Sequence, residues 1–171
     1  MTNEESIQIK SLRERLMLKE IILDSIKGGM IRYTDYKGND KYDASWWLET
    51  TSSIFTVVCE VKVREYPLTA YNGWLIEKDK YDYLMSRKEE LKLYINFHPD
   101  GYQIWDLATC TQPTWFKKEE RANNYNTNTR VKTLGDLSST EATIIKRDLN
   151  LTKYLQRANN ILINKKQNEN K

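Results

Sequence analysis

Cysteine and histidine are scarce in this sequence. Among its 171 residues there are two cysteines, Cys59 and Cys110, and one histidine, His98. The cysteines lie far apart and form no Cys-x-x-Cys pair, so neither a disulfide framework nor a zinc site is indicated. A metal site in this protein is therefore expected to use oxygen ligands. His98 stands beside a Pro-Asp-Gly turn and is expected to be an exposed loop residue.

Long apolar runs are also absent. No stretch approaches the roughly 20 apolar residues of a membrane-spanning helix, and residues 1–5 lack the basic and then apolar regions of a signal peptide. The many Asn, Lys, Ile and Tyr residues indicate an AT-rich coding genome, such as that of a phage. We expect a single soluble domain with no membrane partner, in the cytoplasm of a bacterium or of a phage-infected cell.

Charge is distributed unevenly along the chain, which has a net charge of +3. Residues 1–108 hold 15 Lys and Arg against 18 Asp and Glu, whereas residues 109–171 hold 12 against 6. The two parts therefore carry −3 and +6. An acidic part followed by a basic part suits a metal-dependent enzyme that acts on a polyanion. A solvated basic helix face would explain the same charges.

Hydrophobic periodicity and turn residues predict the order of the elements. The expected elements are a helix over 3–27, a hairpin of strands 30–36 and 41–50, a central strand over 54–64, a helix over 74–90, a hairpin of strands 91–97 and 102–107, a long polar loop over 111–133, and C-terminal helices capped at Ser138 or Ser139. The resulting organisation is an α/β core over residues 1–110. The basic loop and C-terminal helices of residues 111–163 pack on this core, and a disordered tail covers residues 164–171.

An acid-x-lysine tripeptide, Glu60-Val61-Lys62, lies late in the apolar central strand. Residues two apart on a strand point to the same side, so Glu60 and Lys62 share one surface, roughly 6 to 7 Å apart. The chain contains four such tripeptides, but only this one lies late in a strongly apolar strand. Burying a carboxylate and an ammonium there is costly unless something compensates their charges, and this cost favours a functional role. Asp43 precedes it on the expected hairpin strand. A charged, solvent-facing strand end is the alternative interpretation.

Together, the element order, Asp43 and Glu60-Val61-Lys62 resemble the core of the PD-(D/E)xK nuclease superfamily, over residues 7 to 107. The resemblance implies a restriction-endonuclease-like fold. Tyr42 stands where the family has its proline. No Gln-x-x-x-Tyr pattern follows Lys62, so a resolvase-like or restriction-like branch fits better than the RecB-like exonucleases.

The resemblance also implies a site and an activity. Asp43, Glu60 and the backbone carbonyl of Val61 would bind Mg²⁺, with Mn²⁺ able to substitute, and Lys62 would complete the catalytic set. Glu20, which falls within the apolar stripe of the first helix, would be an auxiliary ligand, or else it lies at the rim of the stripe and reaches solvent or pairs with Lys62 or Arg13. The implied reaction is hydrolysis of DNA phosphodiester bonds by an endonuclease or a structure-selective nuclease. Family members often pair, so the resemblance also allows a homodimer.

Basic residues outside this set are candidates for binding nucleic acid: Arg64, Lys117, Lys118, Arg121, Arg130 and Lys132. Tyr66 and Tyr71 are expected near the mouth of the site. An alternative function is a non-catalytic domain on the same scaffold that binds nucleic acid or another protein. Such a domain would bind DNA without a metal ion and with a steep dependence on salt.

Overall fold

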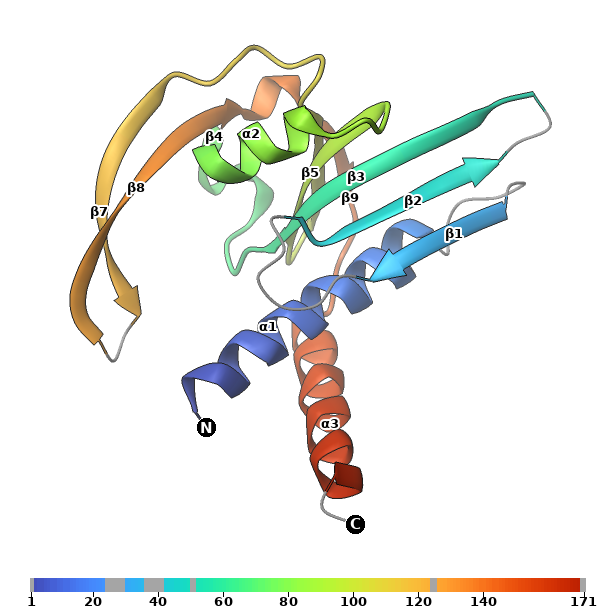
Figure 1. Cartoon of the computed structure of the whole chain (residues 1–171), viewed down its shortest axis with the longest axis vertical. Coiled ribbons are helices and arrows are strands. Elements are labelled where there is room, and N and C mark those ends of the chain that lie inside the picture. Colours follow the sequence, from blue (N-terminus) through green and yellow to red (C-terminus); the bar gives the residue numbers. More distant parts are fainter. Residues whose placement is uncertain (1, 24–29, 36–41, 50–51, 124–125, 170–171) are drawn as a thin grey trace.

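The protein has a mixed α/β fold in a computed structural model that describes residues 2–23, 30–35, 42–49, 52–123 and 126–169 (Figure 1). The elements in chain order are α1 (Asn3–Met17), the π-helical turn η1 (Leu18–Ile22), β1 (Met30–Asp35), β2 (Ala44–Glu49), β3 (Ile54–Val63), the 3-10 turn η3 (Leu68–Ala70), β4 (Gly73–Glu77), α2 (Lys78–Ser86), β5 (Leu91–His98), β6 (Gly101–Asp106), β7 (Trp115–Asn123), β8 (Asn126–Ser138), the 3-10 turn η4 (Ser139–Glu141), β9 (Thr143–Lys146) and α3 (Leu151–Glu169).

The main sheet has six strands in the order β1-β2-β3-β5-β6-β9. All neighbouring pairs are antiparallel except β3 and β5, which are parallel and are joined by a crossover through β4 and α2. The central position of β3 and the two expected hairpins, β1 with β2 and β5 with β6, are confirmed. A second sheet, in the order β4-β8-β7, lies beside the first.

The two faces of β3 enter two different hydrophobic cores. Val57, Cys59 and Val61 pack with α1, η1 and the start of α3 on one face. Val58 points to the other face and packs with β4, α2 and β8. This burial on both faces explains the nearly continuous apolar sequence of the strand. Glu60 and Lys62 follow Val58 at two-residue steps, so the alternation of the strand directs them toward α2 and the second sheet.

The expected polar loop over 111–133 is wrong, because β7 and most of β8 occupy this segment. Figure 1 shows the two strands as a long curved ribbon extending away from the main sheet. Its base is held by Trp115 and Leu137, which contribute to the second core, and Leu134 is buried there as well. Farther along, the described side chains Lys117, Lys118, Glu119 and Arg130 are exposed. A ribbon without a buried face has no apolar alternation, and therefore its sequence looks like a loop.

Three further boundaries differ from the sequence-based prediction. Residues 73–77 form β4, so α2 begins only at Lys78. Ser138 caps a single 3-10 turn, and β9 follows where a helix was expected. Asn150 accepts a hydrogen bond from the backbone of Lys153 (2.9 Å) and starts α3, which continues through most of the segment expected to be disordered.

His98 is buried, contrary to its expected place in an exposed loop. It is the last residue of β5, one position before the turn. Its ring lies 4.7 Å from that of Trp74, and its Nδ1 donates a hydrogen bond to the carbonyl of Tyr66 (2.9 Å). Burial lowers the pKa of His98, so the ring is neutral at pH 7.

The described helices include none that is long and apolar enough to cross a membrane.

Candidate functional site

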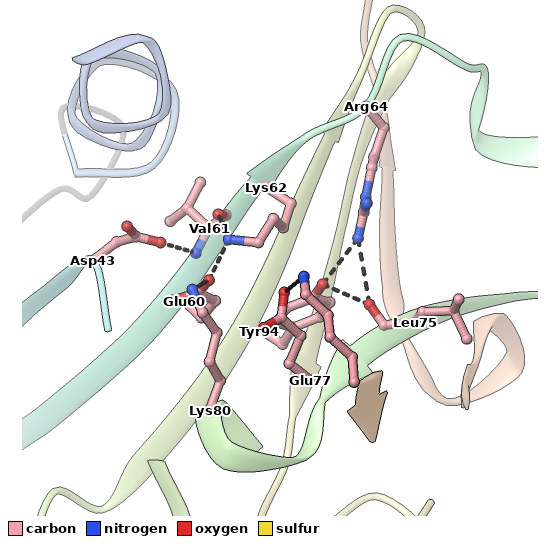
Figure 2. A network of polar contacts seen from close by, with 10 residues as sticks. Asp43, Glu60, Val61, Lys62, Arg64, Leu75, Glu77, Lys80 and Tyr94 are labelled. Carbon is pink, nitrogen blue, oxygen red and sulfur yellow. Dashed lines mark hydrogen bonds and ion pairs between the residues drawn. The ribbon is translucent and has the colours of Figure 1, made fainter. Parts of the chain in front are cut away.

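Asp43 lies where β2 and β3 stop pairing. The register ends with Ala44 opposite Cys59, and the backbone N–H of Asp43 donates to the carbonyl of Cys59 (2.9 Å). One step farther, the carboxylate of Asp43 accepts the N–H of Val61 (2.6 Å), where a continuing ladder would offer a backbone carbonyl (Figure 2). This bond fixes one carboxylate oxygen beside the tripeptide 60–62.

Glu60 is fully buried, at 0% exposure, and carries the second carboxylate of the site. Its Oε1 accepts from two ammonium groups, that of Lys62 on the same strand and that of Lys80 on α2. Figure 2 shows these two lysines reaching Glu60 from different elements. Oε2 of Glu60 is buried and has no hydrogen-bond partner among the described residues.

The ammonium of Lys62 joins the carboxylate to the backbone. Besides its ion pair with Glu60, it donates to the carbonyl of Val61 (3.0 Å). Asp43 is therefore linked to the tripeptide through the N–H of Val61, and Glu60 is linked through Lys62 to the carbonyl of Val61. Lys80 was not predicted, because its segment showed only a helix with mixed charges.

The charges of this group are strongly coupled. Burial raises the pKa of Glu60 above its ordinary value, because the loss of hydration outweighs the attraction of Lys62 and Lys80. Burial acts to lower the pKa of Lys62, but the carboxylates of Glu60, Glu14 and Asp43 overcome it and raise this pKa. Lys62 is therefore an ammonium at neutral pH.

Glu14 on α1 is a third acid that belongs to this electrostatic group. It is buried, and its Oε1 has no hydrogen-bond partner within the described part of the chain. Burial raises the pKa of Glu14 above its ordinary value. The positive charges of Lys62 and Lys10 act to lower this pKa, and the negative charge of Glu60 acts to raise it. Met17, Leu18 and Ile21 follow Glu14 at helical steps and enter the core against β3, which places Glu14 on the face of α1 toward the sheet.

Glu20, the expected auxiliary ligand, lies away from this group and forms an ion pair with Arg157 of α3. Its partner is thus neither Lys62 nor Arg13. The helical projection correctly placed Glu20 near Leu12 and Leu16. Those residues, however, pack toward α3 through the cluster of Ile9, Ala158 and Leu162, whereas a different face of α1 meets the sheet.

A pocket of about 240 Å³ opens beside Glu60 and is rich in cationic side chains; we call it the lysine pocket. Its lining comprises Lys10, Lys62, Arg64, Leu75, Glu77, Lys80, Tyr94, Lys132 and Leu134. Five of these residues are cationic and one is acidic, and that acid, Glu77, is paired with Lys132 (2.6 Å). The excess of positive charge suits an anionic ligand such as a phosphate.

Arg64 forms one wall of the lysine pocket. Its Nη2 donates to the hydroxyl of Tyr94 (2.9 Å) and to the carbonyl of Leu75 (3.4 Å), and these bonds hold the guanidinium in place. Nε of Arg64 has no partner among the described atoms. The structure therefore places Arg64 beside Lys62, as expected for a residue that contacts a phosphate.

The basic residues expected to bind nucleic acid on the ribbon lie on different faces of its strands. Lys118 pairs with Lys132, and Lys117 pairs with Thr133, so the two lysines of β7 point to opposite faces. Lys132 lines the lysine pocket, whereas Arg130 lies farther out on β8. The side chain of Arg121 lies outside the described part of the structure.

No group of three or more His, Cys, Asp or Glu side chains arranged to hold a metal ion is found among the described residues. The carboxylates instead meet lysines and a backbone N–H. Comparisons with models of protein families, with curated proteins and with solved structures found no match to this chain. Function is therefore inferred from the side chains themselves.

Proposed function

We propose that this protein is a Mg²⁺-dependent DNA nuclease of the PD-(D/E)xK type. The observation that carries the proposal is that the carboxylates of Asp43 and Glu60 are both bound to the tripeptide 60–62, whose Lys62 lines a cationic pocket. The order α1, β1 to β3, α2 and β5, with β3 and β5 parallel, supports a restriction-endonuclease-like core.

The donor atoms of the site fit a Mg²⁺ ion. Asp43, Glu60 and the Val61 carbonyl offer oxygen ligands of the kind Mg²⁺ prefers, and Mn²⁺ accepts the same donors. The unpartnered buried oxygens of Glu60 and Glu14 would gain from a cation, because a buried carboxylate without compensation is costly. When bound, the ion would polarise a phosphodiester and lower the pKa of a water molecule.

The chain's own cations have separate tasks in this proposal. Arg64, Lys80 and Lys132 bind the phosphate in the lysine pocket and orient it toward Glu60. Lys62, an ammonium whose pKa the neighbouring carboxylates raise, stabilises negative charge on the reacting phosphate. Glu14 takes the auxiliary role that the sequence assigned to Glu20.

A plasmid-nicking assay with Mg²⁺ or Mn²⁺ tests the proposal. We expect wild-type protein to cut supercoiled or branched DNA, and Asp43→Asn, Glu60→Gln or Lys62→Ala to lower the rate by about 100-fold or more. Glu20→Gln is the matched control, because this carboxylate pairs with Arg157 outside the site. Intact DNA with the wild type, or full activity with Lys62→Ala, would refute the assignment.

A non-catalytic nucleic-acid-binding domain is the second candidate. It is favoured by the ion pairs of Lys62 and Lys80, which compensate Glu60 without any metal ion. Such a domain would show DNA binding that needs no divalent cation, and calorimetry would detect no heat of Mg²⁺ binding.

A further inference from the structure

A second hollow, of about 540 Å³, adjoins the lysine pocket; we call it the aromatic pocket. It is lined by Arg64, Tyr71, Gly73, Trp74, Leu75, Phe116, Lys118 and Asp136. Arg64 and Leu75 line both pockets, so the two pockets adjoin each other at these side chains. A ligand whose phosphate occupies the lysine pocket would have its neighbouring groups beside the aromatic pocket.

Large apolar side chains remain exposed around the aromatic pocket. Tyr71 is 51% exposed, Phe116 is 42% exposed and Leu75 is 37% exposed. Single exposed apolar residues are common, but a group of them around one hollow marks a binding surface. The ring of Tyr71 is held edge-on against Trp74 (5.1 Å between centroids), and Arg64 lies over the same indole (5.3 Å). The surface thus offers fixed planar groups.

An acid in the aromatic pocket indicates which part of a nucleotide it suits. The carboxylate of Asp136 is exposed and folds over Gly73, where a methyl group would collide with it. A carboxylate repels a second phosphate, but it accepts hydrogen bonds from the amino edge of a base. With one acid, two cations and several aromatic rings, this pocket differs in kind from the lysine pocket.

We propose that the aromatic pocket binds an unpaired nucleobase next to the phosphate held in the lysine pocket. In a duplex the flat faces of a base are covered by its neighbours, so a base reaches such a pocket only by leaving the stack, which costs least where the strand is single, mismatched or branched. The inference rests on the proposed function for its ligand class. It adds that the substrate contains an unpaired nucleotide at the site.

Binding of a single-stranded oligonucleotide that contains 2-aminopurine tests this proposal without any divalent cation, so that no cutting occurs. We expect Phe116→Ala and Tyr71→Ala each to weaken binding by about fivefold or more, the usual effect of losing one stacking ring. Phe55→Ala is the matched control, because Phe55 has the same 42% exposure and lies outside both pockets. Its affinity should stay unchanged, and the 2-aminopurine fluorescence should fall on binding to wild type.

A second measurement requires no variant. Replacing the central base of the oligonucleotide by an abasic site should weaken its binding to the wild-type protein by a similar factor, whereas affinity for fully paired duplex should not depend on Phe116. Equal binding of Phe116→Ala, wild type and Phe55→Ala, together with equal binding of abasic and normal strands, would overturn the proposal. Plasmid nicking separates the base-pocket proposal from the nuclease proposal. A protein that cuts DNA but shows equal binding in all these comparisons is a nuclease without the base pocket. A protein that shows the full series without cutting keeps the pocket and loses the nuclease assignment.

Discussion

Glu60 is a carboxylate with no exposure to solvent whose charge is compensated by two lysines that are only partly buried. The side chains of Lys62 and Lys80 are 18% and 24% exposed. Both lysines line the lysine pocket, whereas the carboxylate has no exposure to solvent, so the loss of both partners would leave a buried charge without compensation.

The double variant Lys62→Met with Lys80→Met should therefore lose about 3 kcal/mol of unfolding free energy when divalent cations are absent, whereas each single variant loses much less. Adding Glu60→Gln should restore most of the loss, because the buried charge is removed. Urea unfolding of the four variants measures these differences. Equal losses from the single and double variants would show that the two ammonium groups do not share Glu60.

Glu14 should reveal its burial through a stability that depends on pH. Its pKa in the folded protein is raised above the ordinary 4.5, so its favourable contribution is present below that value and is lost as the pH rises through the folded pKa. Glu14→Gln should accordingly stabilise the metal-free protein at pH 7, by on the order of 1 kcal/mol, and this advantage should vanish toward pH 4.5. Urea midpoints at several pH values test it, with Glu20→Gln as a control that gains nothing. An advantage independent of pH would contradict a raised pKa.

Side chains at the site differ in how far the sequence predicts them. Glu60 and Lys62 could be found, because a charged pair two residues apart in an apolar strand is an unusual local pattern, and Asp43 could be found because it precedes the pair on the expected hairpin strand. Glu14 and Lys80 could not, since each lies on a helix whose other charges look similar. Only the packing of α1 and α2 on opposite faces of β3 brings these two residues to the tripeptide.

At the scale of elements, local pattern predicted the strands with buried faces and failed for the ribbon. β3, β5 and β6 pack on cores and show apolar residues at the expected positions. Among the described side chains of β7 and β8, only those at the base are buried, so the ribbon shows no apolar alternation. β4 is a five-residue strand that pairs with β8 across a long sequence separation and leaves no local signal, so the second sheet was missed as a whole.

The ribbon's register predicts unequal roles for its two adjacent lysines. Lys118 lines the aromatic pocket, whereas Lys117 is not among the lining residues of either pocket. Lys118→Ala should therefore weaken DNA binding and reduce the slope of log affinity against log salt by about 1. Lys117→Ala, a change of the same charge one residue away, should have a smaller effect. Titrations at several salt concentrations measure both, and equal slopes for the two variants would mean that the ribbon binds DNA without regard to its faces.

For the molecule as a whole, α3 influences the site through its packing on α1. It packs on α1 through Ala158 and Leu162, which meet Ile9, and through the ion pairs of Arg157 with Glu20 and Lys166 with Glu5. Figure 1 shows the two helices in contact on one side of the main sheet. Because α1 also carries Glu14, the position of α3 determines how one acid of the site is placed.

Overpacking this contact should therefore affect both stability and cutting. Ala158 is fully buried, so Ala158→Leu has no room and should lower the unfolding free energy by about 1 to 3 kcal/mol. Asn160→Leu puts the same side chain on an exposed position of the same helix and should change little. In the proposed nuclease, Ala158→Leu should also slow plasmid nicking at temperatures where the variant is fully folded, because α1 shifts and moves Glu14. A destabilised variant that nicks at the wild-type rate would show that the α1–α3 contact stabilises the fold without positioning Glu14.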